Sequence, residues 1–310
     1  MSIQSSIQNF HPSAKFFLLL ALFVIFLFVG EIIQLLIFIS TSDIKSINEL
    51  ANLSFLSKIN PNILKLSQAL SVIVSFIIPA FLFSYFSSAE KSSYLKLNKG
   101  FSLALGISVV ILVFSVMPII NWAGEINSHM KFPEFIQGIE TWMKDKEDEA
   151  KKLTESFLQM DGIVDLLGNL IVIALLAAVG EELFFRGCMQ NIFVEWFKNK
   201  HAAVWITAIL FSALHVQFYG FLPRMLLGVV LGYIYIWSGS LWLSILFHFL
   251  NNGMAVIFSF LISKGSISEQ AETVGSGETP FYYVIGSALV SIGILMFIQK
   301  QSIKTIQETN

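Results

Sequence analysis

The sequence predicts an all-α membrane protein, a bundle of about eight transmembrane helices with an amphipathic helical loop on its outer side. Of its 310 residues, 55% are apolar and only 13% are charged, whereas a soluble domain carries about 25% charged residues. The apolar residues form long unbroken runs and do not alternate, which excludes a transmembrane β-barrel. A net charge of −2 gives no indication of nucleic-acid binding, and the single cysteine, Cys188, excludes an intrachain disulfide.

The apolar runs define the predicted spans in chain order. The first, 16–40, is too long for a signal-peptide core of about 7–15 residues and is followed by no clear small-x-small cleavage site, so we expect it to cross the membrane. The later runs cover 67–87, 101–121, 163–185, 203–218, 222–238, 241–262 and 281–299. The runs at 203–218 and 222–238 are short, and the segment 219–223 between them predicts a tight hairpin.

The basic residues predict the orientation of the bundle. With the N-terminus inside, the short cytoplasmic segments carry lysines next to membrane ends: Lys91, Lys96, Lys99, Lys198, Lys200, Lys300 and Lys304. The outer segments hold a similar number of bases, but these are spread over longer loops that are rich in Asp and Glu. The positive-inside rule therefore favours a multi-pass protein of the cytoplasmic membrane with both termini in the cytoplasm.

The long outer segment, 122–162, has a helical pattern of its own. Apolar residues recur at helical spacing from Phe135 to Met143 and again from Ala150 to Leu158, on either side of the charged run 144–149. One or two amphipathic helices lying on the membrane surface explain this pattern. A solvated helical loop packed on the bundle explains it equally well.

Three charged residues interrupt the fourth apolar run, in the sequence Gly180-Glu181-Glu182-Leu-Phe-Phe-Arg186-Gly187. One charged side chain at the centre of a membrane helix costs about 2.5–3.5 kcal/mol, so three unpaired ones would cost roughly 8–10 kcal/mol. Glu182 and Arg186 are four residues apart on one helical face, which predicts an ion pair. Glu181 is rotated by about 100° from Glu182, and therefore needs another partner or a water-filled cavity.

Further polar residues interrupt two later spans. His215 lies near the end of the 203–218 run, and His248 and Asn252 lie four residues apart in the 241–262 run, so they share a helical face. Each histidine alone would be interpreted as a hydrogen-bonded core residue. Together with the two glutamates and the arginine, they could meet only inside the bundle, and we interpret the set as a functional site.

The residue types in this site suit hydrolysis. A glutamate in an apolar cavity can accept a proton from water near neutral pH, because desolvation disfavours its charged form. Imidazole and carboxamide groups can donate hydrogen bonds to an oxyanion. Alternatively, Glu181, His215 and His248 could bind a Zn²⁺ ion that activates the same water, although no His-Glu-x-x-His helix is present. The sequence leaves the metal requirement open.

Three motifs resemble those of the CPBP intramembrane proteases, which include CAAX prenyl endopeptidases and bacteriocin-processing or self-immunity (Abi) proteins. The motifs are Glu181-Glu182-x-x-x-Arg186, Phe211-x-x-x-His215 and His248-x-x-x-Asn252, in this order on successive spans. The resemblance covers about residues 160–260. It implies that Glu181 activates water with help from His215, that His248 and Asn252 stabilise the oxyanion, and that Glu182 and Arg186 shape the site. The family is commonly labelled metalloprotease, although a metal-free glutamate mechanism has also been argued for it.

The resemblance suggests a division of the chain into N-terminal membrane helices (1–121), the outer loop (122–162), a CPBP-like catalytic core (163–262) and a C-terminal loop, last membrane helix and tail (263–310). The expected substrate is a membrane-associated or CAAX-type protein or peptide. The rival interpretation is a non-catalytic membrane protein, either a transporter or an immunity factor that binds a peptide. A transporter would be favoured by broken helices in matching positions of two halves, and the sequence has no such symmetry.

Overall fold

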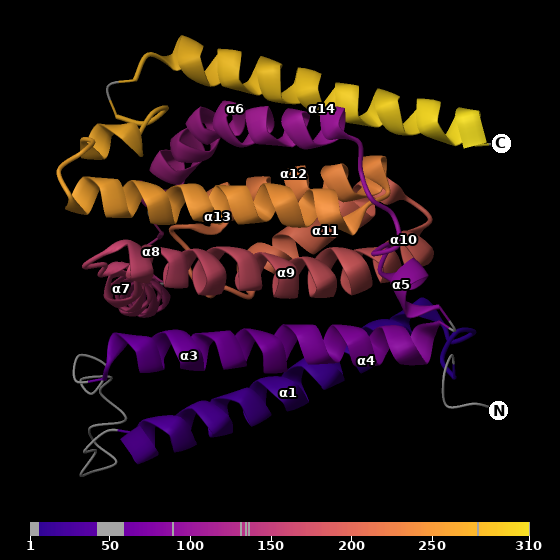
Figure 1. Ribbon diagram of the computed structural model, residues 1–310, viewed down its shortest axis with the longest axis horizontal. Coiled ribbons are helices and arrows are strands. Elements are labelled where there is room, and N and C mark those ends of the chain that lie inside the picture. The colour runs from indigo at the N-terminus through magenta and orange to yellow at the C-terminus, as the bar shows by residue number, and fades with distance from the viewer. Residues whose placement is uncertain are drawn as a thin grey trace.

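The computed structural model of the protein is a stack of helices, and the residues that it describes include no β-strand (Figure 1). These residues are 6–41, 59–88, 90–130, 132–133, 135, 137–277 and 279–309. The predicted all-α fold is therefore confirmed.

Seven of the described helices are long and apolar enough to cross a membrane, close to the predicted number of about eight. They are α1 (Pro12–Thr41), α3 with α4 (Pro61–Val72 and Ile78–Ser87), α6 (Leu103–Ser128), α8 to α10 (Ile163–Asn169, Ala177–Glu182 and Asn191–Phe197), α12 (Phe221–Ser238), α13 (Leu241–Ser263) and α14 (Phe281–Thr309). Two of these helices continue through π-helical turns, at Ile73–Ile77, Leu170–Leu176 and Leu183–Gln190. A short helix α5 (Lys91–Tyr94) and a 3₁₀ turn (Glu269–Ala271) lie in the connections.

The predicted span at 203–218 is a shorter helix. Helix α11 (Lys200–Ala213) has 14 residues, which gives a length of about 21 Å, against about 30 Å for the apolar core of a bilayer. The chain leaves the helix before Val216, whose φ of 53° places this β-branched residue in the left-handed region. The predicted run continued to residue 218 because Val216 and Phe218 are apolar. In the structure both residues belong to the turn that leads into α12.

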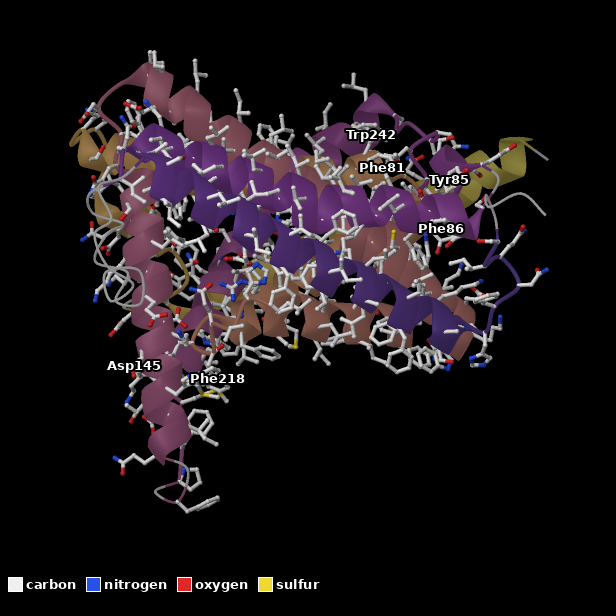
Figure 2. The ribbon with its side chains drawn as sticks, turned by 90° about the horizontal axis from the view of Figure 1, so that it is seen from below. Phe81, Tyr85, Phe86, Asp145, Phe218 and Trp242 are labelled. Carbon is white, nitrogen blue, oxygen red and sulfur yellow. The ribbon has the colours of Figure 1, made fainter. Side chains whose placement is uncertain are left out.

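The predicted amphipathic outer segment contains one long helix, α7 (Gln137–Leu158), in which no residue is buried. Helix α6 extends to Ser128, past the predicted end of the third span at residue 121. Helix α7 is seen end-on in Figure 1 and lengthwise in Figure 2, where it carries the labelled Asp145. It therefore lies across one end of the bundle, whereas α1 begins and α14 ends at the other end.

The fourth long helix, α8 to α10, lies in the middle of the stack, between the layer of α12 and α13 and the layer of α3 and α4 (Figure 1). Phe184 and Phe185 are buried on it and pack against aromatic rings of three other helices: Phe23, Phe76 and Phe211. Two ion pairs connect the N-terminal helices to it: Lys15 Nζ lies 2.9 Å from Glu195 Oε1, and Lys65 Nζ lies 3.4 Å from Asp165 Oδ1.

Two glycines of α12 allow close packing of α11 and α12. A Cβ atom on Gly228 would lie 3.0 Å from the Cβ of Ala208, and one on Gly232 would lie 2.9 Å from both Val204 Cγ1 and Gln190 Oε1. The Gly228-x-x-x-Gly232 motif thus faces the inside of the bundle, as internal helix packing requires.

Replacing Gly232 with Ala should destabilise the protein. Alanine favours a helix over glycine by about 0.5–1 kcal/mol, but overpacking of a close contact costs about 1–3 kcal/mol. Thermal melting in detergent should show a lower midpoint for Gly232→Ala. The matched control is Gly293→Ala on α14, where a Cβ meets nothing within 4 Å and the midpoint should stay the same or rise. Equal midpoints for both variants would contradict the packing argument.

The orientation can be tested by labelling one end of the bundle at a time. In a Cys188→Ala background, Lys146→Cys on α7 should react with an impermeant maleimide from the outside only, because the positive-inside rule places segment 122–162 there. Lys200→Cys, at the start of α11, should react from the cytoplasm only and serves as the control. Reaction of position 146 from the cytoplasm alone would overturn the orientation.

Candidate active site

Four of the six predicted site residues, with at least one from each motif, line one cavity of about 300 Å³. Glu181 on α9, His215 after α11, and His248 and Asn252 on α13 all line it. Glu182 and Arg186 lie behind this wall with side chains that are 0% exposed. The predicted residues therefore form two groups, a buried pair and a set that faces the cavity.

Glu182 is held by hydrogen bonds from three side chains. Its Oε1 accepts from Arg186 Nη1 at 2.6 Å and faces His248 Nδ1 at 2.9 Å, and its Oε2 accepts from Ser244 Oγ. Arg186 in turn donates from Nη2 to the carbonyl oxygen of Gly228 at 3.1 Å, and its guanidinium lies 4.8 Å from the centre of the Phe211 ring. The predicted pairing of Glu182 with Arg186 is thus present, and both acceptor oxygens of Glu182 are occupied.

Glu181 has a different environment, although it is the adjacent residue. Its side chain is 16% exposed, and its Oε2 lies 3.7 Å from His248 Nε2. The ring of His248 therefore stands between the two carboxylates, with Nδ1 toward Glu182 and Nε2 toward Glu181. Of the two glutamates, Glu181 is the one whose carboxylate can reach a water molecule in the cavity.

The hydrogen bonds of the two histidines define which ring nitrogen is available to the cavity. His215 Nδ1 lies 2.8 Å from the carbonyl oxygen of Phe211, so Nδ1 carries the proton and donates it. His248 Nδ1 donates to Glu182 in the same way. In each neutral ring Nε2 can then accept a proton, and it can donate a hydrogen bond only when the ring is charged. Asn252 Oδ1 accepts from Asn251 at 3.3 Å, which leaves the amide nitrogen of Asn252 as its donor.

A buried asparagine of α6 holds the turn that brings His215 to the cavity. Asn127 is fully buried, its Nδ2 donates to the carbonyl oxygen of Phe218 at 2.9 Å, and its Oδ1 accepts from the amide of Leu222 at 2.6 Å. Gln217 in the same turn donates to Glu147 of α7 at 3.4 Å, and Figure 2 shows Phe218 beside this helix. The turn is therefore held from two sides, by α6 and by α7.

The arrangement of these side chains does not form a metal site. Among the described residues, no group of three His, Cys, Asp or Glu side chains is placed to hold a metal ion. Glu181, His215 and His248, the residues proposed from the sequence to bind Zn²⁺, line the same cavity but do not form such a group. The residues in this arrangement do not fit a preformed zinc site.

Sequence reasoning missed three polar residues of this region. Ser244 donates a hydrogen bond to Glu182. It could have been identified from its spacing, because it lies four residues before His248 and eight before Asn252, on the same helical face. Asn251 and Arg224 line the cavity as well. Arg224 looks in the sequence like a basic residue that flanks a span, because it lies near the start of the 222–238 run.

Replacing Glu182 with Gln should destabilise the protein, because it leaves the buried Arg186 without an opposite charge. Removing one partner of a buried ion pair typically costs about 3–5 kcal/mol. Melting in one detergent should show a large drop for Glu182→Gln and little change for Glu181→Gln, the isosteric control at the adjacent position. If Glu181→Gln were the less stable of the two, the assignment of the two glutamates would be reversed.

The segment that carries the motifs matches a known family. The sequence model described as "Type II CAAX prenyl endopeptidase Rce1-like" matches residues 163–254, which include all the predicted site residues. Among curated proteins, the "Uncharacterized protein YpbD" of Bacillus subtilis (strain 168) is 29% identical over 86 residues, which is 26% of this chain and 41% of that protein. The chain thus matches about two fifths of the length of this relative, and no solved structure matches it significantly. The resemblance seen in the three motifs is confirmed: residues 163–254 match the Rce1-like type II CAAX prenyl endopeptidases, consistent with the CPBP family.

Proposed function

We propose that this protein is an intramembrane endopeptidase that hydrolyses a peptide bond of a membrane-associated or CAAX-type substrate with a water activated by Glu181. The observation that carries the proposal is the contrast between the two neighbouring glutamates. Glu182 is completely buried and bound to three side chains, whereas Glu181 faces a cavity that His215, His248 and Asn252 also line. The family match at residues 163–254 supports a protease.

The proposed reaction follows general acid–base chemistry. The Glu181 carboxylate accepts a proton from water, and the water oxygen attacks the carbonyl carbon of the scissile bond. The amide nitrogen of Asn252 and, in the charged ring, Nε2 of His248 donate hydrogen bonds to the oxyanion that forms. Glu181 then returns its proton to the leaving amine, and His215, which lines the same cavity, assists it. Glu182 and Arg186 fix the position of His248.

A second cavity supports a substrate that is partly embedded in the membrane. It has a volume of about 760 Å³, lies between α6 and α13, and shares Leu227 and Asn251 with the smaller cavity. Its walls include Met117, Met254 and Phe258, so they suit an apolar part of the substrate. The lipid bilayer and a membrane-associated substrate are the proposed partners.

Replacing Glu181 with Gln should abolish most of the activity without unfolding the protein. The change removes the basic carboxylate, and general-base catalysis typically contributes 10²–10⁴-fold. Purified protein in detergent should cleave a membrane-tethered peptide, and the rate should fall by at least about 100-fold in Glu181→Gln. Activity of the unchanged protein should survive chelation of metal ions.

Two outcomes would contradict the proposed mechanism. Turnover by Glu181→Gln at the rate of the unchanged protein would exclude Glu181 as the base. Activity that is lost on chelation and restored by added Zn²⁺ would assign the water activation to a metal. A protein that binds membrane-tethered peptides but cleaves none would favour the rival function, a non-catalytic immunity factor or peptide-binding protein.

A further inference from the structure

Arg224 is a charged residue of the cavity that the proposed reaction does not use. It lies in the first turn of α12 and lines the cavity together with Glu181, His215 and His248. Its position is defined by its neighbours: Nη2 donates to Gln217 Oε1 at 2.7 Å, and Gln217 is bound to Glu147 of α7. A Cβ atom on Gly220 would lie 3.2 Å from Nη2 and 3.3 Å from Nη1, so the glycine allows the guanidinium to pack against the backbone.

The guanidinium of Arg224 has hydrogen-bonding capacity that the described residues do not use. Its Nη1 is buried and has no hydrogen-bond partner in the part of the chain that the structure describes. Among the ion pairs of the described residues, none involves Arg224. A buried cationic donor without an anionic partner is costly, and an arginine offers two parallel N–H groups that match the two oxygens of a carboxylate.

The other arginine of this region gives a useful comparison. Arg186 is paired with the Glu182 carboxylate at 2.6 Å and is completely buried behind the cavity wall. Arg224 is bound to a neutral amide instead and lies on the wall itself. Two further buried polar atoms without a partner among the described residues, Glu147 Oε2 and the Tyr219 hydroxyl, lie in the adjacent segments. These atoms lie near Arg224, because Gln217 connects Glu147 of α7 and Arg224 through its side chain. Other buried atoms without a partner among the described residues, including Nε of Arg186, lie elsewhere in the bundle.

We infer that Arg224 is a substrate-binding residue that receives a carboxylate of the peptide, close to the bond that is cleaved. The inference rests on the proposed function, because the peptide must lie in the cavity with Glu181. The carboxylate has two sources, the free C-terminus of the peptide or an acidic side chain. In the first case the protein would cleave near a free C-terminus, and in the second it would require an acidic residue near the scissile bond.

The test compares matched peptides in which only the carboxylate changes. A membrane-tethered peptide is made in four forms, with a free or amidated C-terminus and with Glu or Gln in the segment after the scissile bond. A charged hydrogen bond contributes about 10- to 100-fold to affinity, so the unchanged protein should prefer one acidic form by about that factor in kcat/KM. The C-terminal pair identifies the first source of the carboxylate, and the Glu/Gln pair identifies the second.

The variants assign this preference to Arg224. In Arg224→Gln the acidic-to-amide ratio should fall toward one, mainly through KM, and Arg224→Lys should restore part of it. Lys144→Gln, which removes an exposed positive charge of α7 that is paired with Glu140, should keep the full ratio and controls for general charge effects. A full preference retained by Arg224→Gln, or no preference in the unchanged protein, would overturn the inference and leave the proposed hydrolysis intact.

A binding measurement separates this inference from the proposed function. The same peptides are titrated against Glu181→Gln, with and without Arg224→Gln, and binding is followed instead of cleavage. The acidic form should bind more tightly only where Arg224 is present. If the unchanged protein cleaves none of the peptides but this difference in binding is found, the proposed hydrolysis fails and the carboxylate site stands. If binding shows no difference, the inference about Arg224 fails.

Discussion

The site depends on one buried ion pair between Glu182 and Arg186. Both side chains are fully buried, so neither charge can be left without the other. The pair also fixes its surroundings, because Glu182 holds His248 and Ser244 of α13, and Arg186 holds the backbone of α12 at Gly228. Three helices are thus connected through two side chains. Because the hydrogen bonds of Glu182 fix the rotation of its helix, the adjacent Glu181 faces the cavity.

The short hairpin of α11 and α12 provides the space in front of Glu181. Because α11 ends at Ala213, the chain turns back beside the cavity and brings His215 and Arg224 to its wall. Asn127 of α6 and Glu147 of α7 hold this turn, and Val216 adopts its unusual backbone conformation within it. Strained backbone is often found at functional sites, which fits a turn that carries His215 and leads into the first turn of α12, where Arg224 lies.

The sequence predicted the helical class, most of the spans and the Glu182–Arg186 pair, because run length and i,i+4 spacing are local properties. It did not predict that the helix in the 203–218 run would end at Ala213. Val216 and Phe218 lie in the turn, but their apolar side chains are of the kind expected in a membrane span. Hydrogen bonds between residues far apart in the chain, such as those between Asn127 and the turn, could not be predicted from the sequence either. Arg224 was missed because the sequence alone does not distinguish a base that flanks a membrane span from one that lines a cavity.

The most direct test of this account is a double-mutant cycle on the buried pair, with Glu182→Gln, Arg186→Met and the double variant melted in the same detergent. If the pair holds the site together, each single change leaves an uncompensated buried charge or a buried acceptor without its donor. The double variant should then be more stable than the sum of the two single losses predicts, with a coupling of about 0.5–3 kcal/mol. Losses that simply add would show that the two side chains act independently, and would contradict the central role of the pair.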